Sequence, residues 1–441
     1  DSDAIRNLLN INGKIFLPAG YSFLIGSTIR YHNKQQLKIS GGGTIILEKD
    51  IKAFDIFNVE NLQIDGIFVD GSNQHGNSHE LNVFLEGDQI EYASINKVFM
   101  KDGAIGIRIN NVKNYTLSSC MADNFSGWAF VSGGYLENVI WKNNISTNGS
   151  YDGLKMSGVL KNAIVTENIC IGNGRDGFDF AGHSIENLKV FDNIFSLNQI
   201  EGIEIKLLDR DDYPLPSDLT DPVFKNIEVY NNTLDKNGSF GINMKNRYEE
   251  VPTKNVKIKH NNISGFETKT FNVYGMRLQF IVEVKGDVLV EYNDIEGHES
   301  GIRLVNSDKI VVRRNNIRSF RRCVTVENQG HASTGNLIEK NNLTSLDGNC
   351  VYLDNVEGNI VRDNDWESPS EQYKVNIGGL SNNYIFDNIT KDVITTTTPS
   401  RRGIKGELIP SADKVASGCL GWIATDTSSS ATWVPFGVLA N

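Results

Sequence analysis

The chain has 441 residues, a formal net charge of -11, 39% hydrophobic residues and 22% charged residues. A chain of this length exceeds one ordinary compact domain unless it is a repeat that grows in one dimension. The acidic balance excludes a general nucleic-acid binder and argues against attraction to an anionic membrane. No apolar run reaches the roughly 20 residues that a membrane span requires, so we expect no membrane insertion.

From residue 106 onward the chain repeats a short phrase: glycine, an apolar residue, a variable residue and a second apolar residue. Successive phrases at Gly153, Gly177 and Gly202 are 24 and 25 residues apart, and two late variants begin with cysteine. The phrases begin at Gly106, Gly127, Gly153, Gly177, Gly202, Gly241, Gly275, Gly301, Cys323 and Cys350. A period of this size predicts a repeat architecture.

A second repeat runs out of phase with the first and ends in an asparagine and an aliphatic residue. Its asparagines include Asn144, Asn168 and Asn193. Asparagine tolerates the left-handed region, so we expect these residues at tight bends, with their amides stacked in a ladder. Short β-branched runs such as 227–230 and 256–259 are typical of strands, and no long segment has a helical period.

These features predict an all-β, right-handed, single-stranded parallel β-helix over residues 1–390. A propeller blade is nearer 40 residues, and the leucine pattern of a leucine-rich repeat is absent. Two longer spacings place polar excursions at 207–224 and 247–253, and we expect both to wall a groove.

The end of the chain reads differently from the repeats. Residues 391–400 read as a linker, and 401–441 as a small C-terminal β segment that must pack on another chain or back on the helix. The five cysteines are scattered and odd in number. Buried, reduced thiols without a chemical role are the expectation for them.

Strand alternation turns the apolar residues of each phrase inward and the variable residue outward, about 4.8 Å from its equivalent on the next coil. The outward column is Arg108, Ala129, Lys155, Asp179, Glu204, Asn243, Arg277, Arg303, Thr325 and Tyr352. A second outward column holds Ser157, Ala181, Lys206, Lys245 and Gln279, and the positions before the glycine hold Asp152, Asp176 and Glu201. The columns predict a polar patch centred on coils 153 to 277.

Four of these residues put carboxylates in repeated slots of two neighbouring coils. Crowding of like charges raises one pKa, as the acid of a glycosidase requires, while a second carboxyl acts as base or nucleophile. We rank Asp179 and Glu204 first as catalytic residues, Asp176 next and Glu201 last. The expected separation of the Asp179 and Glu204 carboxyl groups suits a retaining enzyme, in which the two groups lie roughly 5–5.5 Å apart. A diagonal pair such as Asp176 with Glu204 would lie farther apart, which suits an inverting enzyme. The sequence leaves both open.

The remaining candidates are substrate-binding residues. Polar and cationic side chains frame the acids, and tyrosines offer flat faces on which sugars stack. His183 is either a bend residue or a base, and Trp128 is expected in the core. The substrate-binding set is Lys155, Lys206, Asn243, Lys245, Arg277, Arg303, Tyr151, His183, Tyr213 and Tyr248. No cofactor and no metal are expected.

The opening residues 13–20 (GKIFLPAG) and 37–45 (LKISGGGTI) resemble the first coils of pectate-lyase-like β-helices, a superfamily that includes bacteriophage tailspikes. The repeats between about 100 and 390 and the terminal GWI and WVPFG phrases are similar to the same group. The resemblance implies a homotrimeric spike of the virion tail that binds and cleaves a bacterial surface polysaccharide such as O-antigen, capsule or exopolysaccharide.

Two other functions stay open beside hydrolysis. A polysaccharide lyase would neutralise a uronate with cations such as Lys155, Lys206 and Arg277 and take a proton with His183 or a lysine. An adhesin would bind glycan without cutting it. The carboxylates outnumber what a lyase needs, and a pure binder has little use for crowded acids, so hydrolysis is the first expectation.

Overall fold

The structure is a computed structural model that describes residues 1–48, 51–73, 83–208, 219, 221–246, 251–266, 273–280, 288–331, 333–368, 375–378, 383–386, 388–390, 408–410, 421–424 and 433–436. These residues form an all-β parallel solenoid of about 13 turns, in which α1 (Ser2–Asn12) is the one helix. No helix in these ranges has the length and hydropathy of a membrane span. The chain divides into two compact units, Asp1–Asn243 and Met244–Asn441. The predicted fold class is confirmed.

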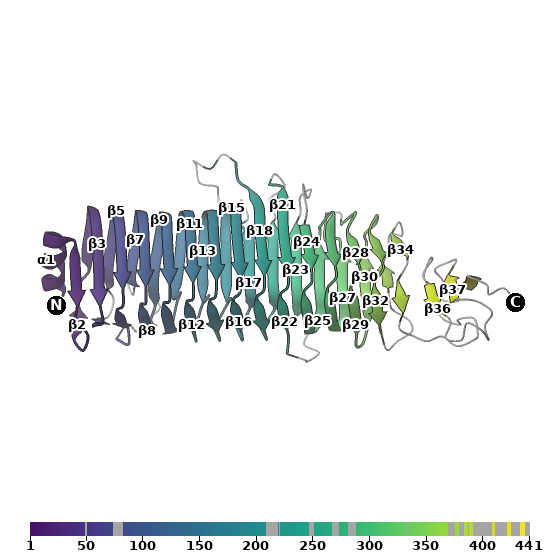
Figure 1. Ribbon diagram of the computed structural model, residues 1–441, viewed down its shortest axis with the longest axis horizontal. Coiled ribbons are helices and arrows are strands. Elements are labelled where there is room, and N and C mark those ends of the chain that lie inside the picture. The colour runs from purple at the N-terminus through teal and green to yellow at the C-terminus, as the bar shows by residue number, and fades with distance from the viewer. Residues whose placement is uncertain are drawn as a thin grey trace. The chain divides into compact units, whose positions relative to one another are not determined.

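Most coils of the first unit combine a long strand that bends in its middle with a short strand (Figure 1). Each strand of the first series pairs in parallel with the next: β1 (Lys14–Leu17), β3 (Ile29–Gly41), β5 (Lys52–Asp65), β7 (Val83–Asn96), β9 (Ile105–Ser118), β11 (Phe130–Lys142), β13 (Leu154–Thr166) and β15 (Phe178–Phe191). On the next coil two shorter strands, β17 (Glu201–Leu207) and β18 (Phe224–Tyr230), pair with the two halves of β15. The short series is β2 (Ser22–Ile25), β4 (Thr44–Leu47), β6 (Phe68–Asp70), β8 (Phe99–Gly103), β10 (Met121–Phe125), β12 (Ile145–Thr147), β14 (Ile169–Ile171), β16 (Ile194–Ser196) and β19 (Thr233–Asp235). The boundary between the units falls within β20 (Phe240–Asn246).

The bend and the ladder use consecutive residues of the asparagine repeat. The left-handed residue is the first of the pair, as at Asn143 with φ 56°, whereas the sequence analysis placed the bend at the second. That second residue turns inward: Asn144 Nδ2 donates to Asn168 Oδ1 at 2.9 Å, and Asn168 Nδ2 donates to Asn193 Oδ1 at 3.0 Å. The ladder is therefore confirmed and the position of the bend is corrected. An inward amide must be paired because a buried unpaired polar group is costly.

A short helix, α1, covers the first coil, although the sequence pattern predicted no helix there. Ile5 and Leu9 lie one turn apart on its buried face, and Gly13 ends it with φ 63°. Ser2 Oγ accepts from the backbone N–H of Gly26 at 3.0 Å. The helix therefore covers the open edge of the solenoid, which would otherwise pair with other strands.

The second unit continues the same architecture with parallel strands. One series is β21 (Thr253–Lys259), β24 (Val288–Glu291), β26 (Ile310–Arg313), β28 (Leu337–Glu339), β31 (Ile360–Arg362) and β34 (Tyr384–Phe386). The second is β22 (Asn262–Ser264), β25 (Asp294–Val305), β27 (Asn316–Glu327), β29 (Asn342–Ser345), β32 (Asp365–Glu367) and β35 (Ile389–Thr390). The strands β23 (Tyr274–Phe280), β30 (Asn349–Asp354) and β33 (Val375–Gly378) complete the coils beside β25 and β27.

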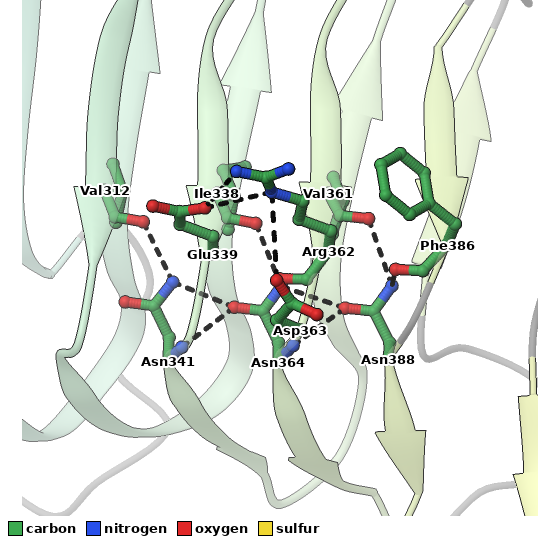
Figure 2. A network of polar contacts seen from close by, with 10 residues as sticks. All are labelled: Val312, Ile338, Glu339, Asn341, Val361, Arg362, Asp363, Asn364, Phe386 and Asn388. Atoms are coloured by element: carbon green, nitrogen blue, oxygen red, sulfur yellow. Dashed lines mark hydrogen bonds and ion pairs between the residues drawn. The ribbon is translucent and has the colours of Figure 1, made fainter.

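An asparagine ladder also fixes the bends of the second unit. Figure 2 shows Asn341, Asn364 and Asn388 in line, each donating to the amide oxygen of the next residue or to a strand carbonyl. Outside the ladder, Arg362 pairs with Glu339 at 2.8 Å. The inward amides thus replace water as partners of the buried bend carbonyls.

Part of the predicted C-terminal segment is described. The strands β36 (Leu408–Pro410), β37 (Gly421–Ala424) and β38 (Trp433–Phe436) pair antiparallel. The predicted linker 391–400 and Cys419 lie outside the described residues. The other four cysteines are buried and form no disulfide with any described residue, as predicted.

Candidate active site

The repeated phrase builds the predicted outward column. Lys155 on β13, Asp179 on β15 and Glu204 on β17 are register partners on adjacent strands. Their neighbours Phe178 and Phe180 are fully buried in the coil interior, so alternation turns the middle residue to the outer face. The column formed by these three residues is confirmed.

The glycines allow a second row of acids to come close. Asp152, Asp176 and Glu201 each precede the glycine position on successive coils. A Cβ at Gly177 would lie 2.7 Å from the carbonyl oxygen of Gly202, closer than real Cβ contacts. Glycine is therefore required where these coils approach each other, and it brings the acidic row against the column.

The two rows make a buried cluster of five carboxylates. Their exposed fractions lie between 0 and 6%, although the sequence pattern placed them on the outer face. Carboxylate oxygens lie within 4.8 Å of one another in two triplets that share Asp176. The triplets are Asp152, Asp176, Asp179 and Asp176, Glu201, Glu204.

Partly exposed cations offset much of this negative charge. The Lys155 ammonium contacts Asp179 and lies 3.9 Å from Asp152, and the Lys206 ammonium contacts Glu204. Arg175, which sequence reasoning missed, places Nε 3.7 Å from Asp152 Oδ1. Buried charges of one sign need such partners because desolvation is expensive.

Asn243 joins the two glutamates of the cluster. Its Nδ2 donates to Glu201 Oε1 at 2.8 Å and to Glu204 Oε1 at 3.1 Å. The residue is fully buried, so the amide fixes both carboxylates without adding charge. The prediction that Asn243 belongs to the patch is confirmed in its geometry.

Asp176 is the most enclosed acid of the cluster. Its Oδ1 accepts the backbone N–H of Glu201 at 2.9 Å, while Oδ2 is buried and has no hydrogen-bond partner among the described residues. Burial, followed by a hydrogen bond and repulsion from Glu201, raises the pKa of Asp176 far above its ordinary value. Asp176 is therefore protonated at neutral pH.

Asp179 has a protonation equilibrium near neutral pH. Burial raises its pKa to about 6, while attraction by Lys155 and Lys206 lowers it and repulsion from Asp152 and Glu204 raises it. A group with such a pKa can both give and take a proton near neutral pH. For Lys206, burial opposes the charge, but attraction by Asp179 and Glu204 prevails and raises its pKa.

An aromatic pair flanks the acids, and one member corrects the sequence analysis. Trp128 is half-buried rather than in the core: its Nε1 donates to Asp152 at 3.0 Å and its ring lies 4.9 Å from that of Tyr151. The error was one of register, because Phe130 pairs with Leu154, which puts Ala129 and not Gly127 in the glycine slot. The outward partner of Arg108 is accordingly Val131 rather than Ala129.

Most of the other predicted binding residues belong to the second unit or lie outside the described residues. In the second unit Arg277 and Arg303 are register partners as predicted; Arg277 donates to Gln279 and Arg303 pairs with Glu327. Lys245 also belongs to that unit. Tyr213, Tyr248 and most of the two predicted groove-wall excursions lie outside the described residues.

His183 occupies a widened bend of β15. The register shifts between Gly158 and Val159, so β15 carries one extra residue there. Its Nδ1 is buried without a hydrogen-bond partner among the described residues, and burial lowers the pKa of the ring. This geometry fits the interpretation of His183 as a bend residue, and among the described residues it makes no hydrogen bond or ion pair with the acids.

Either acidic triplet has the oxygen donors that calcium or magnesium prefer. Lysine ammoniums already contact Asp179 and Glu204, so the positive charge that these oxygens require comes from the chain itself. The arrangement suits acid–base chemistry, with paired carboxylates in different protonation states. The absence of a metal and a cofactor stays a prediction.

Comparisons with known proteins agree with the fold. A family model described as a right-handed β-helix region matches residues 222–364. A mutant tailspike protein of E. coli bacteriophage HK620 is similar in structure with a TM-score of 0.54 at 9% identity, covering 87% of this chain and 73% of that one. No curated protein matches the sequence.

Two further solved structures are similar at a lower score. The A-module of Azotobacter vinelandii mannuronan C-5 epimerase AlgE6 has a TM-score of 0.47 at 12% identity and covers 89% of this chain and 95% of that one. The HK620 tailspike in complex with a pentasaccharide has a TM-score of 0.45 at 11% identity, covering 87% and 74%. The family model and the likeness to the mutant tailspike protein agree that the chain folds as a right-handed parallel β-helix.

Proposed function

We propose that the protein is an endo-acting glycoside hydrolase that binds and cleaves a bacterial surface polysaccharide. The observation that carries the proposal is the juxtaposition of Asp179 and Glu204 on adjacent strands, each beside its own lysine. Two carboxyl groups in different protonation states are the minimum machinery for glycoside hydrolysis.

In this proposal Asp179 is the general acid and Glu204 the nucleophile. Asp179 gives its proton to the glycosidic oxygen as the bond from that oxygen to C1 breaks, and the electron pair leaves with the alcohol. Glu204, ionised beside Lys206, attacks C1 and forms a glycosyl ester. The Asp179 carboxylate then takes a proton from water, whose oxygen attacks C1 and releases Glu204.

The strand spacing supports a retaining reaction. Equivalent side chains on adjacent strands start about 4.8 Å apart, near the roughly 5–5.5 Å between the carboxyl groups of retaining enzymes. A substrate must first displace Lys155 and Lys206, whose side chains are 15% and 23% exposed and lie over the acids. Long lysine side chains change rotamer easily, so this displacement is local.

A second candidate is β-elimination from a uronic acid. The observation that favours it is the set of three partly exposed cations at the acids: Lys155, Arg175 and Lys206. Such a set would hold a sugar carboxylate. We rank it second because the cations already contact acids of the chain.

We also infer that the protein acts at the bacterial surface as a homotrimeric component of a virion tail. The support for this location and assembly is the likeness of fold to a bacteriophage tailspike protein and the resemblance of the terminal phrases. If the protein binds glycan without cleaving it, the surface around the acids serves recognition alone and the protein is an adhesin.

The test uses the full chain and purified O-antigen, capsule and exopolysaccharide from candidate hosts. Size-exclusion profiles report chain length, a reducing-end assay reports hydrolysis, and the ultraviolet absorbance of an unsaturated uronate reports elimination. Shorter chains with new reducing ends and no such absorbance support the hydrolase. Rising absorbance supports the lyase, and glycan binding without cleavage supports the adhesin; either result overturns the proposal.

Variants locate the chemistry. Asp179→Asn and Glu204→Gln should each lower kcat by about a hundredfold or more, as expected when an acid or nucleophile is lost. Glu186→Gln, the same kind of change on β15 at a carboxylate that pairs with Lys225, should keep full activity. Full activity in both site variants, with thermal unfolding unchanged, would place the active site elsewhere.

A further inference from the structure

Six consecutive short strands of the first unit begin with an apolar residue on the outer face. We call this row the outer apolar stripe, and its members are register partners from coil to coil: Phe68, Phe99, Met121, Ile145, Ile169 and Ile194. Phe68, Phe99, Met121 and Ile194 are 46, 38, 38 and 41% exposed, and the other two are half-buried. The rings of Phe68 and Phe99 stack 5.2 Å apart.

The stripe is not needed by the interior of its own coils. The residues on either side of each member turn inward and fill that interior, as Val98 and Met100 do around Phe99. The neighbouring outward column on the long strands of the same coils is mixed: it reads Gln63, Ser94, Thr116, Ile140, Ile164 and Lys189. The stripe is instead apolar on all six coils, and a contiguous exposed apolar row of this kind marks a surface that another molecule covers.

Charged and polar residues border the stripe on both sides. Lys97 and Glu167 occupy the bends before it and are exposed. Beyond it, Lys101 pairs with Asp70 at 3.0 Å and Thr147 donates to Asp123 at 2.7 Å. An apolar centre with a polar rim is the anatomy of a protein–protein interface.

The exposed area fits the centre of such an interface. Aromatic side chains carry about 150–250 Å², so each phenylalanine of the stripe leaves roughly 80 Å² exposed and the stripe on the order of 400 Å². A standard interface buries about 800 Å² per partner, so the stripe supplies about half and the rims can supply the rest.

We propose that the outer apolar stripe is where copies of this chain pack together, the three stripes facing one another in the proposed homotrimer. The stripe is straight and advances about 4.8 Å per coil, so over five steps it is about 24 Å long. Only a partner with a straight apolar row of the same period can cover every member, and another copy presents that row by construction. Symmetric self-association is also the commonest form of assembly.

This surface gives the proposed self-association a place on the chain. Self-association is tested without any glycan, so a negative result for the stripe would leave the proposed hydrolysis unaffected. A negative result for hydrolysis would likewise leave the proposed packing surface unaffected. Sedimentation of the full chain at micromolar concentration should give a multiple of 49.0 kDa. Phe99→Glu and Met121→Glu, made separately, should weaken association at least tenfold and shift the mass toward a single chain.

Ser94→Glu is the matched control, because Ser94 is exposed on the coil that carries Phe99 and lies outside the stripe. It should keep the mass of the parent. Hydroxyl-radical footprinting of the unmodified chain adds a readout that no folding defect can mimic: Met121 should be protected when concentrated and reactive when diluted. A single-chain mass for the parent, an unchanged mass for both stripe variants, or Met121 reactivity independent of concentration would overturn the proposal.

Discussion

Each acid of the cluster differs in what surrounds its oxygens. Glu204 has a lysine contact and an amide donor, which stabilise its charge. Asp179 has a lysine contact but is fully buried between two other acids, and its pKa rises to about 6. The same residue type in the next slot, Asp176, has no cation within ion-pair distance among the described residues and holds a proton. Position in the cluster, rather than residue identity, therefore separates the pKa of Asp179 from that of Asp176.

The protonation of Asp179 should set the pH dependence of cleavage. A general acid works while protonated, so kcat/KM should be full below the pKa of Asp179 and fall as pH rises through about 6. Lys155→Met removes an attraction that lowers this pKa, so the fall should move to higher pH. Asp152→Asn removes a repulsion that raises it, so the fall should move to lower pH.

The measurement is the pH profile of kcat/KM for the three proteins on one cleaved glycan. Asn in place of Asp152 keeps the size of the side chain and one acceptor oxygen, which can serve Trp128 Nε1 while the longer bond from the backbone N–H of Asp176 is lost. Shifts of both profiles in the same direction, or no shift in either, would contradict the role of Asp179 as the acid.

At the scale of the element, the coils from Asn144 onward carry an inward asparagine beside the bend. Asn341 donates to Val312 O at 3.0 Å and to Asn364 Oδ1 at 2.9 Å (Figure 2). Its own Oδ1 accepts from Asn315 Nδ2 at 3.0 Å. The side chain is 1% exposed, so no water replaces these partners when it is removed. Its sequence neighbour Asn342 is exposed and makes one side-chain bond, to Asn316.

This pair gives a matched stability prediction. Asn341→Ala strands several buried groups and should lower the free energy of unfolding by roughly 1–3 kcal/mol or more. Asn342→Ala should change it by less than about 0.5 kcal/mol, as exposed substitutions do. Thermal and urea unfolding of both variants measure the difference, and equal losses would show that the ladder does not hold the coils.

Register is the second property decided at this scale. The sequence pattern aligned Gly127 with Gly106 and Gly153. In the structure Phe130 occupies the inward position beside Leu154, so Ala129 is the residue that corresponds to Gly153. Burial of a phenylalanine outweighs a glycine match because apolar burial contributes about 25 cal/mol per Å². Trp128 thereby takes the position that Asp152 holds on the next coil, beside the site.

At the scale of the whole molecule, a parallel solenoid has an open edge at each end, and α1 covers the first one (Figure 1). Leu9→Asp would bury an unpaired charge beneath the helix and release it from the first coil. The uncovered strand edge should then cause aggregation at lower temperature. Leu8→Asp, at a residue 46% exposed on the same helix, should not.

Static light scattering during a temperature ramp measures the onset of aggregation for both variants. An earlier onset for Leu9→Asp alone supports an end cap. The same onset for both proteins would mean that the helix is dispensable for protecting the edge.

The sequence by itself determined the coil, its period and the columns that bring Lys155, Asp179 and Glu204 together, because a period near 24 residues repeats each slot at strand spacing. It also placed Asn144, Asn168 and Asn193 in one ladder. A sequence period identifies residues that are neighbours along one column of the coils, and each of these inferences concerns such neighbours.

Only the tertiary structure decided how deeply the acids are buried, which lysine serves which carboxylate, and that Asp176 keeps its proton. It also decided that Trp128 lies at the site and that α1 covers the first edge. Desolvation and pairing depend on side chains that approach from other slots and other coils. The repeat spacing carries no information about those contacts. The sequence therefore located the carboxylates, and their protonation depends on how the coils pack.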